Sequence, residues 1–133
     1  MNVTEGIICH QVNMQKAAGA GLALQIRKKW HGWYVDYQNT DGRLGMTTLW
    51  KVKDGLWVAN LYSQNNVSWR HRMTDYDAFT ICLRNLRAMC TRRQVFFPYG
   101  IGCGIARGDW DVVLPLIEEY IPDATIVKWV PSL

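Results

Sequence analysis

Short apolar segments alternate with amphipathic segments along this chain, and this alternation restricts the fold more than any other feature. Apolar runs that are typical of strands occupy residues 6–12, 46–52, 56–62, 94–99 and 124–130. Apolar residues recur at helical spacing within residues 21–30, 76–90 and 110–121, and residues 32–38 are expected to add a helical turn or two. The resulting order, β-α-β-β-α-β-α-β, predicts a layered α/β domain.

Several turn and cap signals refine this prediction. Asp54-Gly55 separates two of the strand segments and is typical of a type I′ hairpin turn, so the sheet is expected to be mixed. Thr74 followed by Asp77 resembles a capping box, and Asp109 is a candidate cap for the last helix. Pro115 lies inside that helix, where a kink or a cost of about 3 kcal/mol is expected.

Composition excludes several classes of protein. The chain has 133 residues, of which 49% are hydrophobic, so it can bury one core and is not a disordered chain. The four cysteines lie far apart without zinc-ligand spacing, which predicts reduced thiols and no metal site. No cofactor is expected either. We find no membrane-length apolar run and no signal-type opening, and therefore expect a cytoplasmic protein.

Two glycine-containing loops are the strongest candidates for a binding site. Each follows a predicted strand and opens a helix. In the first, His10-Gln11-Val12-Asn13 leads through Gly19-Ala20-Gly21. In the second, Phe97-Pro98-Tyr99 leads into Gly100-Ile101-Gly102-Cys103-Gly104 and then Ala106-Arg107-Gly108. Glycine lets backbone N–H groups approach a ligand, and the positive end of a helix dipole favours an anion. Both loops are expected at the carboxyl ends of their strands, so two such cradles facing one crevice suit a diphosphate. Tight turns and close helix–sheet packing are the alternative explanation for these glycines.

Other residues give weaker signals. Neither loop is a complete G-x-G-x-x-G motif or a Walker loop. Cys103, before a helix, could have a lowered thiol pKa, but its spacing to Arg107 is not that of a cysteine phosphatase, and a small buried hydrophobe is the simpler reading. His10 is expected to be a hydrogen-bonded core histidine more often than a base.

A basic, tryptophan-rich surface is a further possibility. The chain carries a formal charge of +4, and Trp69-Arg70-His71-Arg72 combines an aromatic ring with basic side chains. Such a loop fits the rim of a binding site for an anionic ligand. One aromatic ring is weak support for nucleic-acid binding, which usually uses several stacking rings. Trp69 and Trp129 are the tryptophans that could stack on a base.

Three stretches, HQVNMQKAAGAGLALQIRKKW, WVANLYSQ and FPYGIGCGIARGDW, resemble the macro domain family in sequence and order. They are similar to the branch that holds terminal ADP-ribose protein glycohydrolase, DNA-ADP-ribose glycohydrolases and the yeast-type ADP-ribose-1″-phosphate phosphatase, in its bacterial and phage forms. The resemblance extends along nearly the whole chain. It implies that residues 1–133 form one three-layer α/β/α macro-like domain with a mixed central sheet.

The resemblance also implies a ligand and its contacts. ADP-ribose or ADP-ribose-1″-phosphate would bind between the two loops, with Asn13 positioning the distal ribose. The ligand-binding set implied in this way is Asn13, Gly19, Ala20, Gly21, Ser63, Gly100, Ile101, Gly102, Cys103, Gly104, Ile105 and Trp129.

Departures from the family pattern bear on the chemistry. Where the glycohydrolases carry a lysine after the second hairpin strand this chain has Gln64, and their acid falls at Ala106. An amide and a methyl group cannot form a lysine adduct or transfer a proton, so that mechanism is not expected. Only nine residues precede His10, and none matches the aspartate that reads adenine in the family. Either an N-terminal strand is missing or adenine is held differently.

Three functions therefore compete. The first is hydrolysis of an ADP-ribose derivative, as in removal of a 1″-phosphate, with Asn13, His10 and Gln64 as the residues nearest the chemistry and His10 or His71 acting through water. The second is a module that binds ADP-ribose without turnover. The third, a nucleic-acid binder, is the least expected, and neither a membrane nor a defined oligomer is implied.

Overall fold

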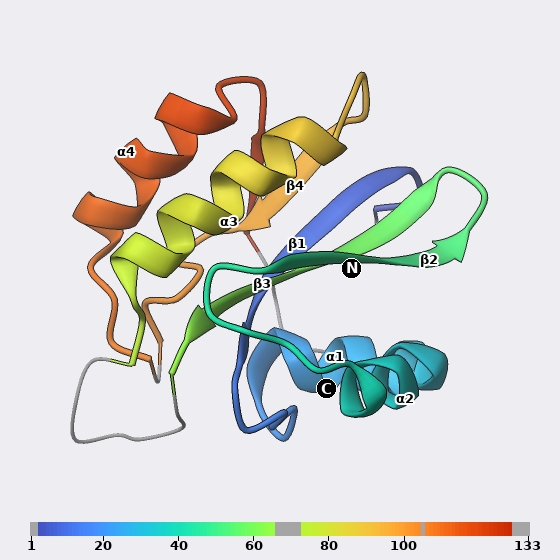
Figure 1. Ribbon diagram of the computed structural model, residues 1–133. Helices are drawn as coiled ribbons and strands as arrows, with labels where there is room; N and C mark the ends of the chain where they lie inside the picture. Colours follow the sequence, from blue (N-terminus) through green and yellow to red (C-terminus); the bar gives the residue numbers. More distant parts are fainter. Residues whose placement is uncertain (1–2, 66–72, 105, 129–133) are drawn as a thin grey trace.

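The computed structural model describes residues 3–65, 73–104 and 106–128, and it has three layers (Figure 1). A central sheet lies between one pair of helices on each face. The elements in chain order are β1 (Gly6–Asn13), α1 (Gly21–Lys29), α2 (His31–Asn39), β2 (Thr47–Lys53), β3 (Leu56–Gln64), α3 (Tyr76–Met89), β4 (Val95–Pro98), α4 (Trp110–Tyr120) and β5 (Thr125–Val127). The predicted three-layer α/β/α class is confirmed, and so is the element order, except that the turn or two expected at residues 32–38 is a separate helix, α2.

The sheet has the strand order β2-β3-β1-β4-β5 and is mixed. Strand β1 pairs in parallel with β3 on one side and with β4 on the other, β4 pairs in parallel with β5, and the hairpin strand β2 is antiparallel to β3. The hairpin is confirmed, but its predicted type I′ turn is wrong. Gly55 has a positive φ of 85° whereas Asp54 does not, and the ladder is irregular between Lys51 and Lys53. The irregularity supplies the twist that a type I′ turn would otherwise provide.

Each face of the sheet has its own apolar cluster. Helices α1 and α2 pack Ile26, Trp33 and Tyr37 against the β1 and β3 face. Helices α3 and α4 cover the opposite face, with Phe79 and Ile117 buried in the other cluster. The alternation of strand side chains explains this division, since neighbouring residues of a strand face opposite sides of a sheet. Strand β1 is buried on both faces for this reason.

The helix ends differ in one place from the sequence prediction. Asp109 caps α4 by accepting a hydrogen bond from the Asp111 N–H at 2.9 Å, as predicted. The cap of α3 is Asp75, which accepts from the Ala78 N–H at 2.9 Å, so the prediction of Thr74 as that cap is wrong by one residue. Pro115 lies inside α4, as predicted. Within the described ranges, no helix has the length and apolarity needed to cross a bilayer.

The pairing of β1 with β3 changes register at its end. Val12 pairs with Tyr62, but Asn13 pairs with Gln64, so Ser63 is an extra residue on β3. Irregularities of this kind re-aim the side chains that follow them. They lie here at the carboxyl edge of the sheet, where β1, β3 and β4 all end.

Candidate functional site

The two glycine loops meet at one pocket. Strands β1 and β4 are parallel neighbours, so the loops that follow them leave the same edge of the sheet. A pocket of about 550 Å³ lies between these loops and is lined by both, including Gly19, Ala20 and Gly21 of the first loop and Gly100, Gly102 and Gly104 of the second. The predicted convergence of the two loops is confirmed.

The first loop is closed by Asn13. Its side-chain Oδ1 accepts from the Ala17 N–H at 3.0 Å, and its Nδ2 donates to the Ala17 carbonyl at 3.0 Å. Helix α1 begins after Ala20, which has no side chain able to cap it, and Ala20 to Ala23 line the pocket. The N–H groups of the first turn of a helix have no partner within it, so this end of α1 offers donors and a positive dipole to the pocket.

The second loop presents alternate N–H groups. Ile101 and Cys103 donate to the carbonyls of Pro98 and Gly100 at 3.1 and 2.8 Å. The N–H groups of Gly100, Gly102 and Gly104 have no hydrogen-bond partner in the part of the chain that the structure describes. Gly100 and Gly102 both have φ of 75°, a conformation that glycine adopts without strain. Because these three glycines also line the pocket, their N–H groups are available as backbone donors to an anion bound there.

A chain of side-chain hydrogen bonds anchors this loop to the sheet. The Thr74 hydroxyl donates to the Gly102 carbonyl at 2.6 Å, and Gln11 Nε2 donates to Thr74 Oγ1 at 3.1 Å. The Ser63 hydroxyl donates to Gln11 Oε1 at 2.8 Å. Gln11 Nε2 also lies 3.3 Å from Gln64 Oε1, so Gln11 links both residues at the end of β3 to the loop.

His10 lies at the pocket wall in a buried polar cluster. Asn60 Oδ1 accepts from Trp33 Nε1 at 2.8 Å and lies 2.7 Å from His10 Nε2. Because the indole N–H can only donate, that Asn60 oxygen is an acceptor and His10 Nε2 carries the proton. Burial lowers the pKa of His10 to about 4, with the Asn60 hydrogen bond acting weakly in the opposite direction. His10 is therefore neutral at pH 7, as expected of a core histidine.

Burial of neutral His10 predicts that folding stability falls in acid. The unfolded chain binds the histidine proton near pH 6.5 and the folded chain only near pH 4, so lowering the pH through this interval favours unfolding. We expect the loss to reach about 3 kcal/mol by pH 4. Urea unfolding at pH 7, 5 and 4 measures it. The His10→Gln variant, which can keep a donor to Asn60, should lack this component of the slope, and equal slopes in both proteins would contradict the prediction.

The predicted site residues divide into three groups. Those that line the pocket are His10, Asn13, Gly19, Ala20, Gly21, Gln64, Gly100, Ile101, Gly102 and Gly104. Ser63 is buried behind Gln11, and Cys103 packs against the α3–α4 cluster, so neither lines the pocket. Ile105, Trp129, Trp69 and His71 lie outside the described residues.

Sequence reasoning missed two notable lining residues. The sequence places Gln11 in the strand that leads into the first loop and gives no sign that its amide contacts three polar side chains. Tyr99 lines the pocket with 64% of its surface exposed, and its ring lies 5.0 Å from that of Trp110. The position of Tyr99 at the end of a predicted strand and directly before Gly100 was the available sequence signal for an aromatic ring at the pocket.

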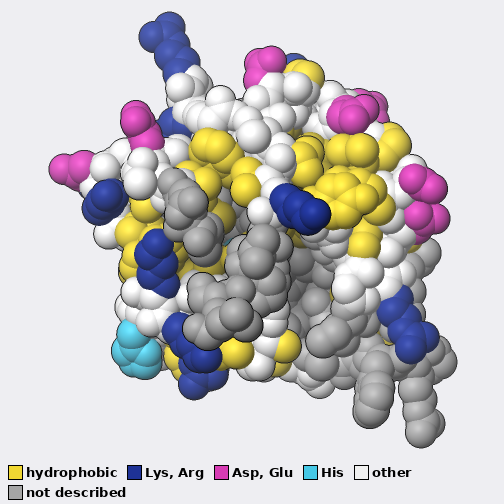
Figure 2. Space-filling model, turned by 180° about the vertical axis from the view of Figure 1, so that it is seen from behind, with side chains coloured by type: hydrophobic (Ala, Val, Ile, Leu, Met, Phe, Trp, Pro, Cys, Tyr) yellow, Lys and Arg dark blue, Asp and Glu magenta, His cyan; other side chains and the backbone are white. Residues whose placement is uncertain are grey.

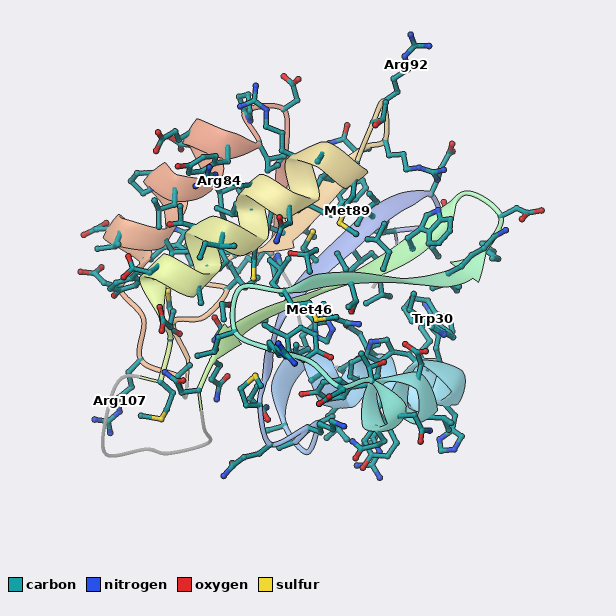
Figure 3. All side chains as sticks on the ribbon, viewed as in Figure 1. Trp30, Met46, Arg84, Met89, Arg92 and Arg107 are labelled. Carbon is teal, nitrogen blue, oxygen red and sulfur yellow. The ribbon has the colours of Figure 1, made fainter. Side chains whose placement is uncertain are left out.

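The cysteine-phosphatase alternative is not assembled. Burial raises the pKa of the Cys103 thiol to about 11, with a smaller contribution from the Asp109 charge, so the suggestion of a lowered pKa is wrong. The helix that follows does not compensate, because Asp109 occupies its N-cap. Arg107 points outward from the second loop (Figure 3). A thiolate and its arginine are therefore not brought together.

Charged side chains are absent from the described lining of the pocket and are spread over the surface. None of the described lining residues is Asp, Glu, Lys or Arg. Figure 2 shows the drawn Lys and Arg side chains spread over one face, with Asp and Glu also on it, rather than gathered in one area. Across residues 3–65, 73–104 and 106–128, no three His, Cys, Asp or Glu side chains are placed to hold a metal ion.

Known proteins of similar sequence and structure agree with the macro-domain resemblance. No family model matches the chain. Human ADP-ribose glycohydrolase OARD1 is 28% identical over 123 residues, which cover 91% of this chain and 77% of the human protein. A protein from Bacteroides thetaiotaomicron has a similar structure, with a TM-score of 0.81 at 26% identity over 95% of this chain and 90% of that one.

Two further solved structures, a macrodomain protein and a complex with ADP-ribose, have similar folds. A macrodomain protein from Streptomyces coelicolor gives a TM-score of 0.72 at 22% identity, over 99% of this chain and 93% of its own. DarTG from Thermosipho africanus, solved in complex with ADP-ribose, gives 0.76 at 18% identity, over 96% of this chain and 38% of its own.

Proposed function

We propose that this chain is a macro domain and that it binds ADP-ribose, or a derivative that keeps the diphosphate, in the pocket between its two glycine loops. Its structural similarity to a macrodomain protein supports this proposal. OARD1 is by name an ADP-ribose glycohydrolase, and the Thermosipho africanus DarTG structure holds ADP-ribose. Those relatives and the resemblance of both loops support ADP-ribose as the ligand. The geometry of the pocket supports the diphosphate as the group that the loops contact.

The observation that supports this proposal most is that two separate groups of backbone N–H donors border the same pocket. Gly100, Gly102 and Gly104, whose N–H groups have no partner among the described residues, line the pocket together with the start of α1, which has no side-chain cap. A single phosphate engages one such set, whereas a diphosphate can engage both. Asn13, through its bond to Ala17, holds the first loop in place and keeps an amide hydrogen free for a ribose hydroxyl.

Recognition is favoured over lysine-dependent glycohydrolysis. Gln64 and Ala106 both line the pocket, at the positions where the resemblance calls for a lysine and an acid. Neither can form an imine or transfer a proton. His10 is a poor base because burial holds its pKa near 4 and its Nε2 is engaged by Asn60. The pocket is thus equipped to bind an anion with backbone donors.

We expect calorimetric titration to detect ADP-ribose but not random oligonucleotides. Because the described lining has no charged side chain, the affinity should change less than about threefold between pH 6 and 8 and between low and moderate salt. A nucleic-acid binder would instead lose affinity steeply with salt. Absence of heat with ADP-ribose at about 1 mM ligand would reject the proposed function.

Hydrolysis of ADP-ribose-1″-phosphate is the second candidate. The two donor sets could stabilise charge that develops on a leaving phosphate. Phosphate release from this compound, compared between the wild type and Asn13→Ala, distinguishes a phosphatase from a binding module. A rate above background that falls in Asn13→Ala supports turnover, and a rate equal in both proteins argues against this site.

A further inference from the structure

The anchoring of the second loop depends on a residue that lies outside the pocket. Thr74 is 2% exposed and does not line the pocket, yet its hydroxyl donates to the carbonyl of Gly102, 28 positions along the chain. The same carbonyl accepts from the Gly108 N–H at 2.7 Å. Both lone pairs of the Gly102 oxygen are therefore occupied, which fixes the plane of the peptide between Gly102 and Cys103.

The direction of every hydrogen bond in this chain is determined. The Gly102 carbonyl can only accept, so the Thr74 hydroxyl donates to it and accepts from Gln11 Nε2. Gln11 Oε1 must then accept from Ser63. The series Ser63, Gln11, Thr74, Gly102 runs in one direction from β3 across β1 to the loop. A hydrogen-bonded network in which every direction is set in this way favours a single conformation.

We propose that Thr74 is a positioning residue that holds the second glycine loop in its anion-binding conformation. This inference rests on the proposed function, since the loop that Thr74 holds is the one proposed to bind the diphosphate. The anchored peptide lies between the peptides that carry the free N–H groups of Gly102 and Gly104, so fixing its plane sets the direction of both donors. Without the Thr74 hydroxyl the Gly102 carbonyl keeps only the Gly108 N–H as a donor, so its peptide plane can tilt and the neighbouring N–H groups lose their fixed direction.

Thr74→Val tests the inference, because valine keeps the shape and removes only the hydroxyl, and Thr74→Ser is the matched control that retains it. We expect Thr74→Val to lower the affinity for ADP-ribose about 10-fold, the equivalent of one directed hydrogen bond, and Thr74→Ser to stay within about 2-fold of the wild type. In the free protein, the amide NMR signals of Gly100, Gly102 and Gly104 should shift or double in Thr74→Val and stay in place in Thr74→Ser. A merely structural role would leave those signals alone.

The outcomes separate the inference from the proposed function. Equal affinity and unchanged loop signals in Thr74→Val, or an equal loss in Thr74→Ser, overturn the inference while ADP-ribose binding by the wild type stands. If the wild type binds no ADP-ribose, the proposed function fails, and the loop signals of the free variants still decide whether Thr74 sets the loop. Should Thr74→Val not fold, Ser63→Ala at the far end of the same series replaces it, with an expected loss of about 3-fold. Unchanged affinity and unchanged loop signals in that variant count against the inference.

Discussion

Replacing Gly104 by valine is expected to lower the affinity for ADP-ribose by about 100-fold or more while the protein stays folded. Gly104 lines the pocket, its φ is not in the left-handed region, and a Cβ built on it has no heavy atom within 4 Å. The protein can therefore accept the side chain, which instead occupies space beside the free N–H groups. A phosphate that cannot reach those donors loses the contacts that favour it.

The choice of position matters for the interpretation. A side chain at Gly102 would meet Gln11 Oε1 at 3.0 Å and would force a residue with φ of 75° into strain, so weaker binding there could reflect a deformed loop. Gly55→Asn at the hairpin turn, on the opposite edge of the sheet from the pocket, is the control for glycine replacement in general. Calorimetry and thermal unfolding of both variants are the measurements. Full affinity in a folded Gly104→Val protein would contradict the assignment of the second loop.

Replacing Asn60 by leucine is expected to lower the free energy of unfolding by about 3–5 kcal/mol. Asn60 is fully buried, and its Oδ1 accepts from both Trp33 Nε1 and His10 Nε2. Leucine leaves two buried N–H groups without an acceptor, each at a cost of about 1–3 kcal/mol. This loss is a large fraction of the roughly 5–15 kcal/mol that keeps a typical domain folded.

Thr48→Val is the matched control for this cluster. It removes the hydroxyl that accepts from Asn60 Nδ2 at 3.1 Å and leaves the Asn60 Oδ1 acceptor in place, so we expect a loss of about 1 kcal/mol. Urea unfolding measures both variants at pH 7. A loss in Asn60→Leu no larger than that in Thr48→Val would show that the acceptor role of Asn60 is not what stabilises the core.

Local sequence patterns predicted most of the fold because the relevant forces act between near neighbours. Apolar periodicity placed every helix and strand to within a few residues, since burial on one face is a property of residues two to four positions apart. The hairpin turn was predicted at the correct place and with the wrong backbone type. Asp54-Gly55 marks a turn, but an irregular ladder beside it relieved the need for a positive φ at Asp54.

The sequence predicted which two backbone loops form the site. Glycines that follow parallel strands signal loops at one sheet edge, so the convergence of Gly19–Gly21 with Gly100–Gly104 followed from topology. The hydrogen bonds that hold those loops were not predictable, because they join residues far apart in sequence. Thr74 shows why: its neighbours suggest a helix cap, but its hydroxyl bonds to Gly102 and leaves the cap to Asp75.

The extra residue at the end of β3 explains how one strand can supply two neighbouring side chains to a single partner. In a regular strand, Ser63 and Gln64 would point to opposite faces of the sheet. Here Ser63 donates to the amide oxygen of Gln11 while Gln64 lies against the nitrogen of the same amide. A chain shortened by one residue at this point would regain even pairing but would send only one of the two toward Gln11. The irregular end of β3 therefore lets two consecutive side chains hold the same amide from both ends. The number of residues in β3 is for this reason a determinant of the site.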